Sequence, residues 1–168
     1  MRRFMLAASL ALATMTPALA QQKAAAIKPV PPPRAEPGLV LVASTLSVKE
    51  TIDRLAKAVE DKGAKVVARV DHAAGAKATG VDMKPAEVLI FGNPKLGTPV
   101  MQGNVRAGLD LPLKMLAYED AAGKVWLLYT APVTLRARYR VLSKDSDVVF
   151  KTMATVLEDV AKTATTKP

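Results

Sequence analysis

The sequence contains no cysteine, one histidine, one tryptophan, three tyrosines and three phenylalanines. Without cysteine the chain forms no disulfide, offers no thiolate nucleophile and lacks the ligands of cysteine-based zinc and haem-attachment sites. So few aromatic residues argue against the stacking platforms of single-stranded nucleic-acid binders, and we expect no nucleic-acid partner. A folded domain of this chain must therefore be stabilised by its apolar core.

Long apolar runs are also missing, and the longest candidate lies within the first twenty residues. Arg2 and Arg3 form a basic start, an apolar stretch covers 4–15, and small residues cover 18–20. This order is typical of a secretory signal peptide, here cleaved after Ala20. The apolar stretch is shorter than the roughly 20 residues of a spanning helix. We expect a periplasmic or secreted protein with no transmembrane segment after cleavage.

The chain is basic, with 24 Lys and Arg against 15 Asp and Glu. Removal of the signal takes away two arginines and leaves a net charge of 22 − 15 = +7. The basic residues are mostly dispersed among acids, as in Lys49-Glu50, which is typical of a solvated surface. The one concentrated run, Arg136, Arg138 and Arg140, makes at most a weak anion site.

Composition divides the exported chain into three parts. Residues 21–37 are rich in proline with small and charged residues between, which predicts an extended tether. A folded domain is expected over 38–142. Residues 143–168 carry an apolar stripe at helical spacing between Val148 and Val160, which predicts an amphipathic C-terminal helix packed on the domain or on a dimer partner.

The apolar patterns within the domain predict alternating strands and helices. Ser47 to Glu50 has the spacing of a capping box, so a helix is expected to begin after Ser47. Asp71 is placed to cap a second, short helix, and Thr98-Pro99 has the form of an N-cap followed by proline at the first helical position. Strands are expected over 38–43, 65–70, 87–91, 113–119 and 124–130, the last two as a hairpin.

Histidine is the one residue type whose usual pKa lies near neutral pH, and His72 is the only histidine and therefore the only imidazole ligand. No serine lies in a nucleophile-elbow pattern, so a hydrolytic triad is not expected. A structural zinc site within one chain is also not expected, because such sites take four His or Cys ligands. Two interpretations remain open. Asp71-His72 is either a structural helix start, or His72 is a ligand or general acid/base oriented by a carboxylate.

Met101 is the best partner for His72 if a metal or haem is involved. A thioether together with an imidazole suits Cu(I) or haem iron. The alternative is ordinary packing, because methionine is a common filler of cores. A dimer offers a further way to bring two such pairs together. We expect no cofactor, and metal or haem binding through His72 and Met101 stays as the alternative.

The segment from Gly92 to Thr98 has the parts of an anion-binding loop. Glycines allow backbone amides to approach a ligand, a helix start follows, and Lys95 adds charge. Ordinary turn chemistry explains the same residues. Asp110 and Lys114 flank a proline before the hairpin, and they either line the same cavity or form an ion pair with each other. Candidate ligand-binding residues are Asp71, His72, Asn93, Lys95, Met101, Asp110 and Lys114.

Several of these motifs resemble the domain-of-unknown-function family 302. The most specific are Ile90-Phe91-Gly92-Asn93-Pro94 and Leu111-Pro112-Leu113-Lys114, supported by Gly63, Asp71-His72 and Trp126. The likeness covers about residues 38–142. It implies an α+β two-layer sandwich in which an antiparallel sheet of four to five strands carries helices on one face, assembled as a homodimer. The family offers no established catalytic residues to transfer.

These observations favour an exported binding module over an enzyme. The ligand hypothesis requires Asp71, His72, Asn93, Lys95 and Met101 to converge near strand ends, and it fails if His72 and Asn93 lie apart with no cavity between them. The alternative of an interaction module, displayed on the tether to a protein partner, predicts an exposed apolar patch and no polar cavity.

Overall fold

A computed structural model of the protein describes residues 36–142 and 144–167. The elements are, in order, β1 Leu39–Ser44, α1 Val48–Asp61, β2 Lys65–Asp71, α2 His72–Ala78, β3 Ala86–Gly92, α3 Pro94–Gly103, the 3-10 helix η1 Val105–Leu109, β4 Leu113–Glu119, β5 Val125–Thr130, α4 Pro132–Tyr139 and α5 Lys144–Thr165. The predicted signal peptide 1–20 lies outside the described residues. So does the predicted tether 21–37, apart from its last positions, Glu36 and Pro37.

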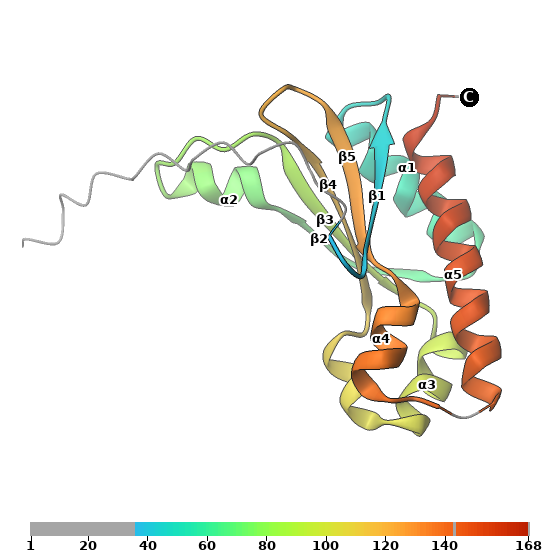
Figure 1. Cartoon of the computed structure of the whole chain (residues 1–168). Coiled ribbons are helices and arrows are strands. Elements are labelled where there is room, and N and C mark those ends of the chain that lie inside the picture. Colours follow the sequence, from blue (N-terminus) through green and yellow to red (C-terminus); the bar gives the residue numbers. More distant parts are fainter. Residues whose placement is uncertain (1–35, 143, 168) are drawn as a thin grey trace, which may run out of the picture.

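The five strands form one sheet in the order β1-β5-β4-β3-β2, and every neighbouring pair is antiparallel. Helices α1 and α5 lie side by side on one face of this sheet (Figure 1). The predicted α+β class, with helices on one face of an antiparallel sheet, is therefore confirmed. β1 and β2 are the edge strands, and β2 carries a bulge between Val66 and Ala68.

The core lies between the sheet and the two long helices. α1 begins as its sequence predicts, because the Ser47 side chain accepts a hydrogen bond from the Glu50 amide and the Glu50 carboxylate accepts from the Ser47 amide. Satisfying free amides at a helix start in this way fixes the first turn. The apolar face that follows, with Ile52 and Leu55, is buried against the sheet and against α5. The same core cluster contains Leu89, Met115 and Leu127 from the sheet and Met153 and Val160 from α5.

The hairpin of β4 and β5 is organised by one carboxylate. Asp120 is 5% exposed and accepts hydrogen bonds from the amides of Ala122 and Lys124 and from the Trp126 indole, at 2.8 to 2.9 Å. The Trp126 hydrogen bond, followed by that of Lys124, holds the pKa of Asp120 below its usual range. Gly123 takes the left-handed position that the turn requires, with φ of 82°.

Helices α5 and α3 can be compared with the helices predicted from the sequence. α5 packs along α1 and contacts α3 and α4, so in this single chain the C-terminal helix covers the domain's own core. α3 begins at Pro94, with Asn93 as N-cap, and not at the predicted Pro99, which lies inside the helix. Among residues 36–142 and 144–167, no helix is long and apolar enough to cross a membrane.

Candidate functional site

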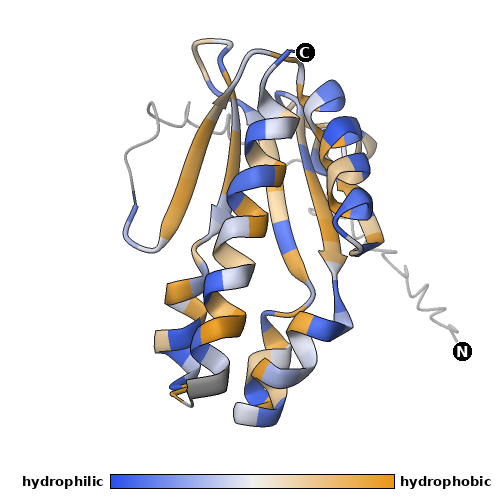
Figure 2. Cartoon of the chain, turned by 90° about the vertical axis from the view of Figure 1, so that its right-hand side faces the viewer, coloured by the Kyte–Doolittle hydropathy of each residue, from blue (hydrophilic) through white to orange (hydrophobic). Residues whose placement is uncertain are grey.

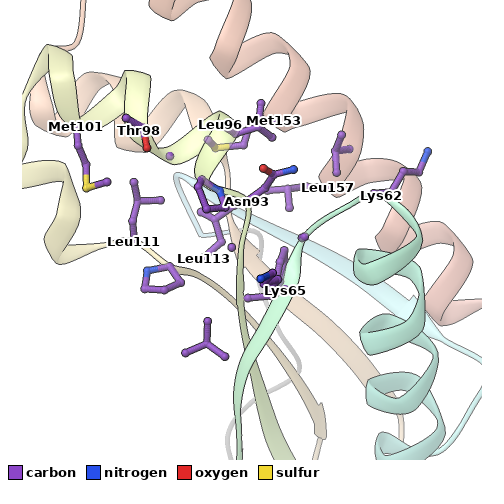
Figure 3. A pocket seen from close by; sticks show the side chains of 18 residues that line it. Lys62, Lys65, Asn93, Leu96, Thr98, Met101, Leu111, Leu113, Met153 and Leu157 are labelled. Atoms are coloured by element: carbon purple, nitrogen blue, oxygen red, sulfur yellow. The ribbon is translucent and has the colours of Figure 1, made fainter.

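A cleft of about 380 Å³ opens at the end of the sheet where β2 begins and β3 ends. Its walls come from the start of β2, the end of β3, α3, the start of β4 and the middle of α5, and Figure 3 shows these side chains around it. The apolar lining is Ala64, Val67, Phe91, Pro94, Leu96, Met101, Leu111, Pro112, Leu113, Met153, Val156 and Leu157. The volume lies within the range of small-molecule sites, about 300–1,000 Å³.

Local geometry at the end of β3 keeps the cleft open. The Asn93 side-chain oxygen accepts a hydrogen bond from the Lys95 amide at 2.9 Å, which starts α3 directly after the strand. Gly92 has no side chain, and a Cβ there would lie 3.4 Å from the Pro112 Cβ. β3 and the chain before β4 therefore approach closely at the floor, while α3 turns away to form one wall.

A few polar groups stand among the apolar lining. Within the described part of the chain, the Lys65 ammonium has no ion pair and the Asn93 side-chain nitrogen and Thr98 hydroxyl have no hydrogen-bond partner. Lys62 is engaged, because its ammonium lies 2.9 Å from Asp159 on α5. In Figure 3, Lys62 stands on the side of the cleft away from Met101 and Thr98. The cleft is thus an apolar slot with hydrogen-bond donors available to a ligand.

The predicted pair Asp71-His72 lies at the other end of the same strands. β2 runs antiparallel to β3, so that Lys65 pairs with Gly92 and Asp71 pairs with Glu87. Six residue steps along a strand span about 20 Å, which separates His72 from Asn93 by the length of β2. Both Asp71 and His72 are exposed. The predicted convergence of Asp71 and His72 with the residues of the cleft is therefore wrong.

The structural interpretation of Asp71 fits its geometry. Its carboxylate accepts a hydrogen bond from the Ala74 amide at 2.8 Å and caps α2. α2 buries none of its residues and projects away from the body of the molecule in Figure 1. Asp71 therefore starts a short, exposed helix and does not line the cleft.

Metal binding through His72 and Met101 has no site within one chain. Met101 lines the cleft, whereas His72 follows the far end of β2, so the two side chains do not meet. No group of three or more His, Asp or Glu side chains suited to a metal occurs in the described part of the chain. Only an assembly of two chains would bring His72 and Met101 together.

The predicted anion loop over 92–98 is wrong as a loop. From Pro94 onwards the segment is helical, and the Leu96 and Gly97 amides both donate to the Asn93 carbonyl. Lys95 is exposed and does not line the cleft. The free amides that a loop would offer to an anion are thus engaged with Asn93.

Asp110 and Lys114 line a separate cavity of about 90 Å³, which shares only Leu113 and Leu157 with the cleft. Asp110 does not pair with Lys114. Its carboxylate accepts hydrogen bonds from Arg138 at 2.6 Å and from the Tyr139 hydroxyl at 2.7 Å. Burial acts to raise the pKa of Asp110, but these two hydrogen bonds together outweigh it and hold the pKa below its usual range.

The cleft contains residues that the sequence analysis did not select. Met153, Val156 and Leu157 come from α5, about fifty residues after the end of α3, and no local motif marks them. Leu111 and Leu113 flank Pro112, in a stretch that the sequence analysis used for the family resemblance and for the start of a predicted strand at residue 113, but not as part of a site.

Comparison with known families gives one match that covers most of the chain. The model described as "Domain of unknown function DUF302" matches residues 40–160. This range includes most of α5, which the sequence analysis placed outside the family core. A crystal structure of an uncharacterised conserved DUF302 protein from Bacillus stearothermophilus has a TM-score of 0.68 at 19% identity, covering 77% of this chain and 99% of that chain. At this identity the likeness concerns the fold.

Curated relatives carry a different name. Proteins named fluoride-specific ion channel, from Brucella suis and Brucella abortus, are each 48% identical to this chain over 127 residues. That match covers 76% of this chain, and 50% and 47% of the two relatives. The chain therefore spans about half the length of the curated relatives that it matches.

Proposed function

The chain belongs to the DUF302 family, and we propose that it is a binding protein whose cleft takes a small apolar molecule with one anionic or hydrogen-bond-accepting group. The observation that carries this proposal is the apolar slot itself. Its lining residues fall in four separate segments of the chain, 62–67, 91–101, 111–113 and 153–157. Their side chains leave a volume of about 380 Å³ unfilled.

The lining sets the class of ligand. Removing an apolar group from water contributes about 0.8 kcal/mol for each buried methylene, so a slot lined by leucine, valine and methionine favours a hydrocarbon chain or ring. Val67 is 61% exposed and lies at the bulge of β2, where it forms part of the rim. A ligand against this rim removes apolar surface of the protein from water as well as its own.

The polar groups set its orientation. Lys65 supplies a positive charge at the start of β2, and the Asn93 side-chain nitrogen supplies a neutral donor. Charge-assisted hydrogen bonds are stronger than neutral ones, so a carboxylate or sulfonate beside Lys65 is preferred over an uncharged head. No group in the cleft suggests bond cleavage, and the function proposed is binding.

A fluorescent probe with the same chemistry tests the proposal. Anilinonaphthalene sulfonate has an apolar ring system and one sulfonate, and its fluorescence rises when water is excluded from it. We expect saturable binding to the wild type. Gly97 lies in α3 beside the cleft, and a Cβ there would lie 3.7 Å from Leu111, an ordinary contact. Gly97→Met is therefore expected to fill the cleft without straining the helix and to abolish probe binding.

Gly75→Met is the matched control. Gly75 is also a helical glycine, it lies in α2, and no atom lies within 4 Å of a Cβ built there. Both substitutions replace glycine in a helix, which favours the helix by up to about 1 kcal/mol. Loss of probe binding in Gly97→Met alone supports the cleft. Equal binding by both variants and the wild type would remove this proposal.

We also propose that the protein is exported and that it forms a homodimer. The export proposal rests on residues 1–20 and the dimer on the family resemblance. A native mass spectrum of the protein purified from cells tests both. A chain that begins at Gln21, seen at twice its monomer mass, is expected. A chain that retains residues 1–20, or a monomer at all concentrations, contradicts the corresponding part.

A second function is suggested by the curated relatives. Because 127 residues of this chain match proteins named fluoride-specific ion channel at 48% identity, we propose that the module associates with such a channel. Co-expression of this chain with a fluoride channel, followed by purification of the channel in detergent, is the test. Retention of this chain on the channel supports association, and its complete loss in the wash contradicts it.

A further inference from the structure

We propose that the end of the molecule formed by η1 and the C-terminal part of α4 docks on an anionic phospholipid surface. This end lies opposite the C-terminus in Figures 1 and 2. It is separate from the cleft and shares none of its lining residues. We call it the basic end and define it by Arg106, Arg138 and Arg140 with the exposed side chains of Val105, Leu109 and Leu142.

Three arginines line one pocket at the basic end. Asn104, Arg106, Arg138, Tyr139 and Arg140 surround a volume of about 260 Å³. Arg138 is held by Asp110, but Arg106 and Arg140 have no ion pair in the described part of the chain. The planar guanidinium group matches phosphate with two parallel hydrogen bonds. Arg106 lies about thirty residues before Arg138 and Arg140 in the sequence. The fold therefore adds a third arginine to two members of the run 136–140.

Three exposed aliphatic side chains lie within three residues of Arg106 or Arg140 in the sequence. Leu109 is 82%, Val105 77% and Leu142 69% exposed, and these are the three most exposed large hydrophobic side chains among the described residues. Single exposed aliphatic residues are normal on protein surfaces. Here the three extreme cases adjoin Arg106, Asp110 and Val141 in sequence and stand at one end of the fold. Aliphatic groups beside arginines are the composition of segments that insert into the lipid headgroup region.

The backbone of Arg140 adds a second observation. Its φ is 51° and its ψ 42°, the left-handed conformation, and it is the only non-glycine residue with positive φ in the described part of the chain. Glycine adopts this conformation at no steric cost and commonly ends helices in this way. The chain instead has an arginine at the end of α4, in the wall of the pocket. Strain of this kind concentrates at functional positions.

The combination of arginines with exposed aliphatic side chains favours a lipid surface over an acidic protein groove. Asp110 forms an ion pair with Arg138, and Asp147 forms one with the preceding arginine of α4, Arg136. Arg106 and Arg140, which have no ion pair in the described part of the chain, are both exposed. Each arginine close to an anionic membrane strengthens binding about fivefold at ordinary salt. We therefore expect weak, reversible docking that salt weakens and that requires both kinds of side chain.

Vesicle binding of the purified protein tests the proposal. We expect it to sediment with vesicles of phosphatidylcholine mixed with phosphatidylglycerol, and not with phosphatidylcholine alone. Arg106→Gln with Arg140→Asn is expected to weaken binding by more than tenfold, from about fivefold per arginine. Asparagine is chosen at position 140 because it tolerates the left-handed conformation. Val105→Ser with Leu109→Ser should weaken the binding that survives in high salt.

Two exposed residues near α2 serve as controls for the substitutions at the basic end. Lys77→Gln and Met83→Ser change an exposed cation and an exposed apolar residue near α2, and both should bind vesicles as the wild type does. Binding that does not depend on phosphatidylglycerol, or that survives the arginine substitutions, overturns the proposal. So does competition by inorganic phosphate without vesicle binding, which would mean a free-anion site. A dimer that Leu109→Ser converts to monomer, again without vesicle binding, would mean an interface between copies.

Discussion

β2 and β3 run side by side for their whole length, yet their two ends have opposite characters. At one end Phe91 is 3% exposed, and α3 and α5 close around an apolar cleft. At the other end the strands lead into α2, which buries no residue. Both ends carry a helix capped by an acidic or amide side chain, Asn93 in one case and Asp71 in the other. A local cap motif therefore says where a helix starts but not whether the helix joins the core.

The largest expected difference between the two ends of β2 and β3 is in how much a packed side chain contributes to the free energy of unfolding. Phe91→Ala removes a buried ring that contacts the core and is expected to lower the free energy of unfolding by about 3–5 kcal/mol. Val70→Ala, at the exposed end of β2, should lower it by about 0.5 kcal/mol, because the side chain is 39% exposed. Urea unfolding curves of the two variants measure this difference. Equal losses would mean that the α2 end contributes to the core.

The two caps give a finer comparison. Asn93→Ala and Asp71→Ala each remove one side-chain hydrogen bond to a helix amide, a loss of about 1 kcal/mol for that helix. α3 carries Val100, which is 2% exposed, so the loss in Asn93→Ala should appear in global unfolding. In Asp71→Ala it should appear only as faster hydrogen exchange of α2 amides. A lower free energy of global unfolding in Asp71→Ala would contradict this difference between α3 and α2.

Acid should lower stability through Asp110, which lines the cavity next to the cleft and accepts hydrogen bonds from Arg138 and Tyr139. Because the folded-state pKa of Asp110 is lowered, its carboxylate adds stability above its unfolded pKa of about 4, and that stability is lost as pH falls through the folded value. Asp110→Asn should therefore be less stable than the wild type at neutral pH, by about 1 kcal/mol, and equal to it in acid. Unfolding curves at a series of pH values check this. A difference that grows on acidification would contradict it.

The smallest effect is expected at His72. The side chain is exposed at the start of α2, so His72→Ala should change the free energy of unfolding by less than about 0.5 kcal/mol. Probe binding in the cleft and the metal content of the purified protein should also stay unchanged. A metal lost from the variant would instead mean that two chains assemble a site around His72.

Elements set by local chemistry were predictable from the sequence. The capping box at Ser47 and the cap at Asp71 are present as expected, and all five strands lie within a few residues of their predicted ranges. α3 was placed too late because Asn93-Pro94 and Thr98-Pro99 have the same cap-then-proline form. Only the packing of Leu96 and Val100 on the core distinguishes the first start from the second.

The site was less predictable, because it depends on how distant segments meet. Asn93 and Met101 line the cleft together with Met153 and Leu157, which reach it from α5. The prediction for His72 was wrong because it placed the end of β2 and the end of β3 next to each other. Antiparallel pairing of 65–71 with 86–92 puts the residues that follow each strand at opposite ends of the sheet. Sequence proximity therefore suggested a cluster that the topology separates.

NMR of protein labelled at the methionine methyls and the histidine ring, during a titration with anilinonaphthalene sulfonate, is the most direct test of the cleft as a binding site. Met101 and Met153 line the cleft, whereas Met83 and the single imidazole, His72, report on the α2 end. We predict saturable shifts of the Met101 and Met153 methyl signals, with the Met83 methyl and the His72 ring signals unmoved. Shifts at Met83 or His72, with Met101 and Met153 unchanged, would contradict the proposed binding function.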